Sequence, residues 1–327
     1  MKFFISILFL FYFVLGNSQI KVLNKLHYKV QWIDQFPNNS SDKKVNKTKW
    51  LTKFLFGKKA DPDLIKPNAI LKIDTDSYMV LDQGNNTIFQ IKNKEKKLPK
   101  TIKKNKLGFT SLVDMCAFTN HEILFTDSRL NKIFRYSEDN KSLLSFETNH
   151  KFNRPTGIAY SNVTREIWVV ETGNHKISVL NENGDLIKTI GKRGSNPGEF
   201  NFPTSIWIDK SGKVYIVDTM NFRIQIFDKS GGLIKVFGEP GNATGYFSRS
   251  KGIATDSLGN IYIVDALFHT VQIFDATGKF LYQFGEQGRD KGQFWMPSGI
   301  FIDNDDKIYI ADSYNARVQI FKLVREK

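Results

Sequence analysis

The hydrophobic pattern of this chain returns at a fixed interval. The segment "YIVDTMNFRIQIFD" at 215–228 recurs as "YIVDALFHTVQIFD" at 262–275 and as "YIADSYNARVQIFK" at 309–322. In each copy two apolar runs flank a short turn, and an acidic residue ends the first run. Weaker copies extend the series to six acids, spaced 45, 44, 47, 47 and 47 residues apart: Asp82, Asp127, Glu171, Asp218, Asp265 and Asp312. A fixed period of this length indicates a repeat architecture.

Each copy predicts four short strands. In the copy that begins at Pro203, the segments "SIWID", "VYIVD", "RIQIFD" and "LIKVFG" follow one another, and turns such as "KSGK" and "KSGG" separate them. Glycine in these turns supplies the positive φ that a tight turn needs. Four short strands in about 45 residues are the signature of a propeller blade. We therefore predict an all-β fold, a six-bladed β-propeller of four-stranded antiparallel blades over residues 67–327.

The last copy lacks a fourth strand, because only "KLVREK" follows Phe321. An open ring would leave a sheet edge exposed, which favours aggregation. Near the N-terminus, "LHYKVQW" at 26–32 alternates apolar and polar residues with a period of two, which is typical of a half-buried strand. We predict that this strand pairs with Val318–Phe321 as the outermost strand of the sixth blade and closes the ring.

The residues before the repeats divide into two parts. Residues 1–18 place Lys2 before the apolar run Phe3–Leu15 and small residues after it, the pattern of a secretory signal peptide. An exported protein, periplasmic or extracellular and without a membrane span after cleavage, is expected; a retained signal anchor is the alternative. Residues 19–66 form a lead-in with the ring-closing strand, a polar linker at 36–49 and a short helix that ends at Gly57. The lysines around that helix leave open a contact with a membrane surface.

The best-formed copy resembles a known repeat. "PTSIWID", "GKVYIVDTMNFRIQIFD" and the closing "FG", in order from Pro203 to Gly238, resemble the NHL repeat, and the two later copies are similar to it. The resemblance implies a six-bladed propeller of the NHL type, of the kind found in exported bacterial proteins. Such propellers are mostly binding platforms for proteins or RNA. Two groups of similar propellers are enzymes: the peptidyl-hydroxyglycine amidating lyases, and lactonases with a channel calcium. The resemblance therefore also implies an enzyme as the alternative.

The charge is distributed unevenly. The formal net charge is +14, but residues 20–106 hold 20 lysines against 8 acids, whereas residues 107–327 hold 26 Lys or Arg against 25 acids. Nucleic-acid binders concentrate basic residues on one face of the folded domain. Blades two to six are nearly neutral, so a nucleic-acid partner is not expected. A protein or peptide partner, or a component of the cell envelope, is expected instead. Cys116 is the only cysteine, so no internal disulfide forms, and its apolar surroundings predict a buried, inert thiol.

Three positions recur around the marker acid, which we number zero. The acid is expected to accept backbone N–H groups of the turn. Asn at +3 is expected to supply a left-handed φ, and Lys or Arg at +5 to pair with an acid. We therefore assign these repeated positions to structure. The members at +3 are Asn85, Asn174, Asn221 and Asn315, and those at +5 are Lys132, Lys176, Arg223 and Arg317.

Function is expected where the copies differ. The tips of the turns between second and third strands vary from copy to copy and share one face of a propeller, and loops on a rigid scaffold usually carry recognition. The alternative is that their apolar side chains pack down between the blades. The predicted ligand-binding residues are Arg129, His175, Met220, Phe222, Leu267, Phe268, His269 and Tyr314.

The enzyme alternative is a metal-dependent lyase or lactonase with a site in the central channel. None of the five histidines has a compact metal-ligand spacing, and a zinc ion between His175 and His269 would require both tips to lean inward. Asp114 falls in an inner strand where other copies have Gly or Ser. It could contribute to a calcium site, but calcium needs six or more oxygen ligands. We therefore predict a binding propeller without catalytic residues, metal or cofactor.

Overall fold

The computed structural model describes residues 28–37 and 63–325, with the exception of positions 76, 93–94, 98–101, 103–106, 120, 138 and 141. The predicted signal peptide, residues 38–49 of the linker and the predicted helix at 50–57 lie outside the described residues. Within the described ranges, no helix has the length and apolar character of a membrane span.

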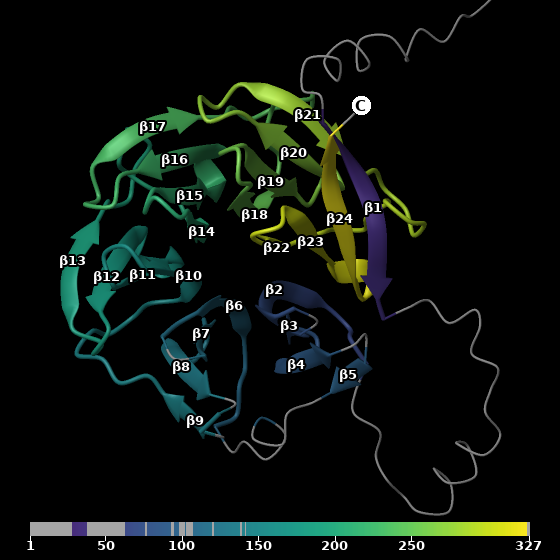
Figure 1. Cartoon of the computed structure of the whole chain (residues 1–327). Helices are drawn as coiled ribbons and strands as arrows, with labels where there is room; N and C mark the ends of the chain where they lie inside the picture. Colours follow the sequence, from purple (N-terminus) through teal and green to yellow (C-terminus); the bar gives the residue numbers. More distant parts are fainter. Residues whose placement is uncertain are drawn as a thin grey trace, which may run out of the picture.

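Six sheets of four antiparallel strands surround a common centre, so the fold is the predicted all-β six-bladed propeller (Figure 1). Blades one to three are β2(Pro67–Asp74) to β5(Glu95–Lys97), β6(Leu112–Ala117) to β9(Ser142–Ser145), and β10(Pro155–Ser161) to β13(Leu186–Ile190). Blades four and five are β14(Pro203–Ile208) to β17(Leu233–Phe237) and β18(Ser250–Thr255) to β21(Phe280–Phe284). Blade six is β22(Ile300–Ile302), β23(Lys307–Asp312), β24(Arg317–Arg325) and β1(Tyr28–Phe36). We call the four strands of each blade A to D from the centre outward.

The second strand of each blade ends on the marker acid, and the third strand begins five residues later. The second and third strands of blades one to five are, in order, β3(Ser77–Asp82) and β4(Thr87–Lys92), β7(Glu122–Asp127) and β8(Lys132–Ser137), β11(Glu166–Glu171) and β12(Lys176–Asn181), β15(Val214–Asp218) and β16(Arg223–Phe227), and β19(Ile261–Asp265) and β20(Thr270–Phe274). The register confirms this arrangement, since Asp218 lies opposite Arg223 in blade four and Asp312 opposite Arg317 in blade six.

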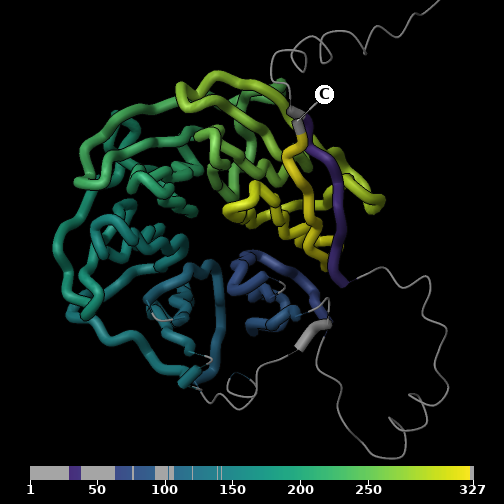
Figure 2. Tube along the Cα trace, in the orientation of Figure 1, coloured from purple at the N-terminus to yellow at the C-terminus, as the bar shows by residue number. Residues whose placement is uncertain are grey.

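The N-terminal strand closes the ring, as predicted. Strand β1 pairs antiparallel with β24, with Trp32 opposite Phe321, and the two strands run side by side in the trace (Figure 2). Trp32 Nε1 donates to Gln319 Oε1 at 3.0 Å, and Arg317 Nη1 donates to Gln35 Oε1 at 3.0 Å. The strand runs further than predicted, to Phe36, whose ring is buried in the core, so the assignment of Phe36 to the linker was wrong.

The core lies between the blades. Each of six apolar clusters joins two neighbouring blades, and the cluster that includes Phe36, Val80 and Tyr309 joins blade six to blade one. Strands β15 and β19 are buried along their whole length because blades cover both of their faces. This explains why the second strands read as continuous apolar runs and do not alternate.

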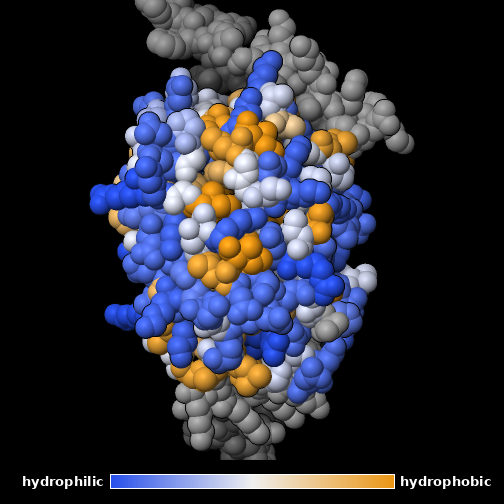
Figure 3. Space-filling model, turned by 90° about the vertical axis from the view of Figure 1, so that its left-hand side faces the viewer, coloured by the Kyte–Doolittle hydropathy of each residue, from blue (hydrophilic) through white to orange (hydrophobic). Residues whose placement is uncertain are grey.

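The outer strands form the rim of the ring. Ile187 on β13 and Ile234 on β17 are each about half exposed, at 50% and 52%. Seen from the left-hand side of Figure 1, the surface carries hydrophobic patches that hydrophilic residues separate (Figure 3). The visible part of the rim therefore offers separate apolar spots and not one continuous binding face.

The marker acids are built into the turns, as predicted. Asp218 accepts from the backbone N–H of Asn201 at 2.7 Å, from Asn221 Nδ2 at 2.8 Å and from Arg223 Nε at 2.8 Å. The basic residue at +5 thus pairs with the marker acid itself. Blade six repeats the set around Asp312, with Arg317 Nε at 2.7 Å.

The predicted position of the left-handed residue was wrong by one. Asn221 lies in the 3₁₀ turn Thr219–Asn221 and uses its side chain to bind Asp218, while Phe222 at +4 has a φ of 53°. The chain must reverse after the 3₁₀ turn and before the third strand, so the strained residue follows the asparagine. All six blades show positive φ at +4: Asn86, Asn131, His175, Phe222, His269 and Ala316.

The two faces of the ring carry different turns. Pro203 at the start of β14 pairs with Asp218, whereas Ile208 at its end pairs with Val214. The turns between strands B and C therefore lie on one face, which we call the BC face, and the turns between strands A and B lie on the opposite face, the AB face. The predicted ligand-binding residues all belong to the BC face.

Candidate functional site

A wide cavity opens on the AB face. It has a volume of about 820 Å³ and lies among the A–B turns of blades four to six, at 209–211, 256–259 and 303–306. Tyr160 and Asn162 of blade three also line it. The predicted binding face is the other one, and only the enzyme alternative drawn from the sequence placed a site in the central channel.

This cavity continues inward. A second cavity of about 190 Å³ lies among the inner strands and reaches all six blades. The two together form what we call the central pocket, with a wide mouth on the AB face and a narrow inner part. The residues that line both are Leu71, Ala117, Tyr160, Asn162, Trp207, Ile208 and Phe301.

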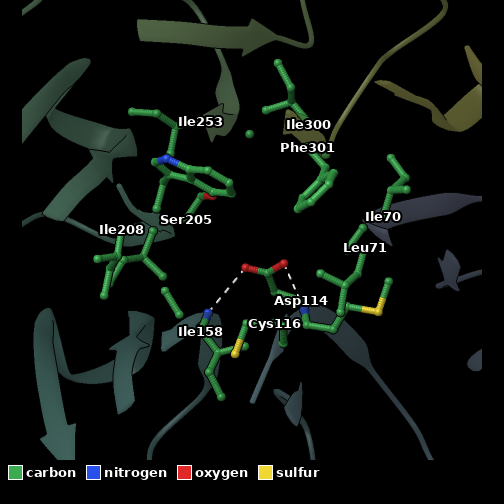
Figure 4. A pocket seen from close by; sticks show the side chains of 18 of the residues that line it. Ile70, Leu71, Asp114, Cys116, Ile158, Ser205, Ile208, Ile253, Ile300 and Phe301 are labelled. Atoms are coloured by element: carbon green, nitrogen blue, oxygen red, sulfur yellow. Dashed lines mark hydrogen bonds between the residues drawn. The ribbon is translucent and has the colours of Figure 1, made fainter. Parts of the chain in front are cut away.

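Asp114, on strand β6, brings a carboxyl group into the inner part. Its oxygens accept from the backbone N–H of Met115 at 2.9 Å and of Ile158, in the next blade, at 3.3 Å (Figure 4). Burial raises the pKa of Asp114 to about 7, against the two hydrogen bonds, which lower it. The carboxyl therefore titrates near neutral pH. The structure confirms that Asp114 lies at the channel, where it is hydrogen-bonded and partly exposed.

Three of the six blades have glycine at the position of Asp114 and leave no room for a side chain there: Gly157, Gly252 and Gly299. Blades one and four carry the small residues Ala69 and Ser205 at this position. A Cβ on Gly299 would lie 2.1 Å from the carbonyl oxygen of Asn68, and one on Gly252 would lie 2.6 Å from that of Ser298. Neighbouring inner strands approach too closely there for anything larger than glycine. Asp114 is thus an exception within the ring, which makes it a candidate for function.

Two aromatic side chains stand where the mouth meets the inner part. The rings of Trp207 and Phe301, from blades four and six, make an edge-to-face contact with centroids 6.1 Å apart. Trp207 Nε1 donates to Thr255 Oγ1 at 2.9 Å, which fixes the indole ring. Phe301 points into the channel above Asp114 (Figure 4). These side chains form a rigid apolar wall beside the carboxyl.

The mouth is acidic. The charged residues that line it are five aspartates and two lysines, Lys72 and Lys210. Asp303 binds Lys72 Nζ at 2.6 Å and also accepts from the Tyr309 hydroxyl, so it is partly structural. The other aspartates are Asp209, Asp256, Asp305 and Asp306. The mouth therefore differs in sign from a chain that carries a net charge of +14.

The predicted BC-face residues divide into exposed and packed ones. Met220, Leu267 and Tyr314 are exposed, at 52%, 48% and 56%, on blades four, five and six. Phe222 and Phe268 are half-buried, and Phe222 packs against the core between blades four and five. The predicted exposure therefore holds for Met220, Leu267 and Tyr314, and the alternative, packing between blades, holds for Phe222. That the exposed members bind a partner stays a prediction.

Arg129 lies apart from that apolar group. It is exposed and lines a shallow cavity of about 410 Å³ between blades two and three, together with Asn131, Asn153 and Arg154. The structure places it on the predicted face but does not bring it together with the exposed apolar tips.

The two predicted histidines serve the backbone. Nδ1 of His175 accepts the N–H of Phe202 at 3.1 Å, and Nδ1 of His269 accepts that of Met296 at 3.0 Å. Burial lowers the pKa of both rings, which therefore stay neutral at pH 7. In the described part of the chain, no group of three or more His, Cys, Asp or Glu is placed to hold a metal ion.

Cys116 lines the central pocket two residues after Asp114. Burial raises the pKa of its thiol well above the usual range, and the nearby Asp114 carboxyl adds to the effect. The group therefore stays protonated at neutral pH, and a protonated thiol is a poor nucleophile. This agrees with the predicted inert thiol, although the side chain faces the pocket.

The aromatic wall could have been found from the sequence by the argument applied to the turn tips. The fifth position of the inner strand also varies between blades, whereas the apolar residue before it is nearly constant. The six residues at this position are Leu71, Cys116, Ala159, Trp207, Ala254 and Phe301. Variation between copies is therefore a useful signal in the inner strands as well as in the turns, as the position of Asp114 also shows.

Comparison with known proteins supports the repeat and the fold. Residues 142–235 match a family described as 6-bladed beta-propeller, and residues 294–321 match the NHL repeat. No match was found among proteins of curated function.

Solved structures share the architecture at low sequence identity. A catalytically inactive virginiamycin B lyase from Staphylococcus aureus, with quinupristin, has a TM-score of 0.60 at 14% identity over 91% of this chain and 100% of that one. An auxiliary nutrient binding protein from Bacteroides thetaiotaomicron has a TM-score of 0.63 at 14% identity over 80% of this chain and 70% of that one. A chain of a nidogen/laminin complex has a TM-score of 0.56 at 16% identity over 76% of this chain and 86% of that one. Such similarity shows a common fold and does not transfer a function.

Proposed function

Since this chain is a six-bladed β-propeller with NHL repeats, we propose that it is an exported binding propeller that holds a small ligand in the central pocket, entered from the AB face. One observation carries the proposal. The wide mouth and the inner cavity have seven lining residues in common, so a single recess runs from the surface to the centre of the ring.

The composition of this recess supports binding. Its inner part is mostly apolar and holds a few polar groups, among them Asp114, Ser205 and Asn162. Ligand pockets usually have this character, because apolar walls supply affinity and a few polar groups supply specificity. Three of the residues that shape the recess, Asp114, Trp207 and Phe301, stand at positions that differ between blades, as expected for a site that occurs once in a repeated ring.

One observation favours the enzyme alternative. The pKa of Asp114, near 7, suits a general acid or base at neutral pH. A lyase or hydrolase would also need a group to stabilise the transition state, and the two predicted histidines are engaged elsewhere. We therefore place binding first and proton transfer by Asp114 second.

A plugging variant tests the site. Ala117 is exposed and lines both parts of the pocket, so Ala117→Trp should block the passage from the mouth to the inner part without disturbing the core. The mature chain is screened by thermal shift against sugars, amino acids, dipeptides, amines and carboxylic acids at millimolar concentration. Compounds that stabilise the wild type should fail to stabilise Ala117→Trp. The control is Ala276→Trp, at an exposed turn position outside the pocket.

Two results would overturn this proposal. In one, no compound stabilises the wild type; in the other, the same compounds stabilise Ala117→Trp equally well. A compound that is consumed by the wild type and survives with Asp114→Asn would move the enzyme alternative to first place.

The proposed export rests on the first 18 residues. When the full chain is produced in a bacterium, the protein should appear outside the cytoplasm in a form shortened at its N-terminus. Leu8→Arg with Leu10→Arg interrupts the apolar run and should keep the uncleaved chain in the cytoplasm. Equal export of both forms would contradict the proposal.

A further inference from the structure

We propose, resting on the function proposed above, that the ligand of the central pocket is an organic cation: a primary amine with a short apolar or aromatic stem, whose ammonium group binds the Asp114 carboxylate. Three features of the pocket carry the inference: an isolated carboxyl at its inner end, an aromatic wall beside it and an acidic mouth.

The carboxyl has no cationic side chain beside it. The lining of the inner part contains no Lys, Arg or His, and Asp114 is its only acidic residue. A buried carboxylate without a counter-ion is costly, and chains avoid the arrangement unless a partner compensates it. No described side chain supplies that compensation. A ligand that carries a positive charge would do so.

The hydrogen-bond geometry leaves room for such a donor. Two ionised oxygens offer about four acceptor positions, and here they receive only two backbone N–H groups, from Met115 and, at a long 3.3 Å, from Ile158. Met115 lies on the same strand as Asp114, and Ile158 lies on the inner strand of the next blade. The oxygens also point toward the open channel (Figure 4). An ammonium group arriving from the channel would meet unused acceptor positions.

The aromatic wall and the mouth favour the same class of ligand. Trp207 and Phe301 present apolar rings between the mouth and the carboxyl, and such rings bind both a hydrocarbon stem and a passing cation. Five aspartates and two lysines line the mouth, so its net charge is negative, and a cleft with an excess of one sign concentrates ligands of the other. The volume of about 190 Å³ in the inner part suits an amine of this size, with any larger portion in the mouth.

The charge of the inner part depends on one group. Its titratable residues are Asp114, Cys116 and Tyr160. Burial raises the pKa of the Cys116 thiol, and burial with a hydrogen bond to Glu182 raises that of Tyr160 to about 12, so neither ionises below pH 9. Only Asp114 changes charge between pH 5 and pH 8. An ammonium ligand needs the ionised form, whereas a carbonyl ligand would need the protonated form as a donor.

The experiment is calorimetric titration of the mature chain with phenethylamine and with its neutral counterpart, phenethyl alcohol, at pH 8 and at pH 5.5. The amine should bind the wild type at least tenfold more tightly than the alcohol at pH 8. This preference should shrink at pH 5.5, because protonation of Asp114 removes the partner. Asp114→Asn should lose the preference at both pH values, while Asp290→Asn, an exposed carboxyl outside the pocket, should behave as the wild type.

Equal binding of the amine by the wild type and Asp114→Asn would overturn the inference, and so would tighter binding of the alcohol. These outcomes are distinct from failure of the proposed function. If another compound binds the wild type and is lost in Ala117→Trp, the pocket is a binding site and only its preference for cations is wrong.

Discussion

At the scale of single residues, the repeat uses one carboxylate to organise each turn. The Asp218 side chain gathers a backbone N–H from the incoming connection, the amide of Asn221 and the guanidinium of Arg223. With Gln225 Nε2 at 3.1 Å, four donors therefore meet on one buried group. This explains why an acid stands at the marker position in every copy.

We expect Asp218→Ala to lower the free energy of unfolding by about 3 kcal/mol, because it leaves buried donors without an acceptor, among them Nε of the largely buried Arg223. Denaturant unfolding measures the change. Asp290→Ala removes an exposed carboxylate and should have little effect. Unchanged stability of Asp218→Ala together with lost ligand binding would identify a site residue and refute the structural role.

The left-handed position at +4 gives a second prediction. Ala316 has a φ of 53°, a conformation that disfavours residues with a Cβ and suits glycine. Ala316→Gly should therefore raise the free energy of unfolding by about 0.5 kcal/mol, the relief of strain exceeding the added chain entropy. Ala276→Gly, at a turn position without positive φ, should lower it. A loss of stability in both variants would contradict the argument.

At the scale of elements, the N-terminal strand is the part that joins the two ends of the chain. Strand β1 supplies the outer strand of blade six, and its Phe36 ring belongs to the core cluster shared with blade one. The strand therefore stabilises both the sheet and the closure of the ring. Its two faces differ, because alternate side chains point to opposite sides.

Trp32→Ala should lower the free energy of unfolding by about 2–3 kcal/mol, since it removes a half-buried ring and its bond to Gln319. Ile33→Ala changes the neighbouring residue, which is exposed, and should lower the value by less than about 1 kcal/mol. Thermal and denaturant unfolding of both variants provide the comparison. Equal effects would mean that β1 does not dock through the face that carries Trp32.

At the scale of the whole molecule, the central pocket exists only because six inner strands meet. Each strand contributes a few lining residues, and the carboxyl of blade two lies below the Phe301 ring of blade six. The surrounding apolar lining, and not a local sequence feature, gives Asp114 its raised pKa. The property belongs to the assembled ring.

The raised pKa predicts a dependence of stability on pH. The folded chain keeps the Asp114 proton up to about pH 7, whereas the unfolded chain releases it near 3.8. The contribution of this group to stability is therefore complete below pH 4 and is lost as the pH rises through 7. Asp114→Asn should gain stability relative to the wild type by roughly 2–3 kcal/mol more at pH 8 than at pH 5.

Denaturant unfolding of the wild type and the variant at both pH values tests this expectation. Asp290→Asn, at an exposed position outside the pocket, is the control. If the gain of Asp114→Asn were independent of pH, the carboxyl would already be ionised at pH 5 in the folded chain.

The sequence by itself determined the six blades, their strands and the closure of the ring by the strand near residue 30. These features depend on periodicity and on a missing fourth strand, both of which are visible along the chain. It also determined that the marker acid builds the turn, because Asp218 finds its acceptor role among residues of its own repeat and the connection before it.

Only the tertiary structure decided which face holds the pocket and what surrounds Asp114. Trp207 and Phe301 lie two blades apart in sequence and meet because the ring brings inner strands together. It also separated Met220, which is exposed, from Phe222, which packs between blades, although both stand in one turn. The exposure of a side chain depends on the residues of other blades that pack against it, and the period of a repeat does not show which residues those are.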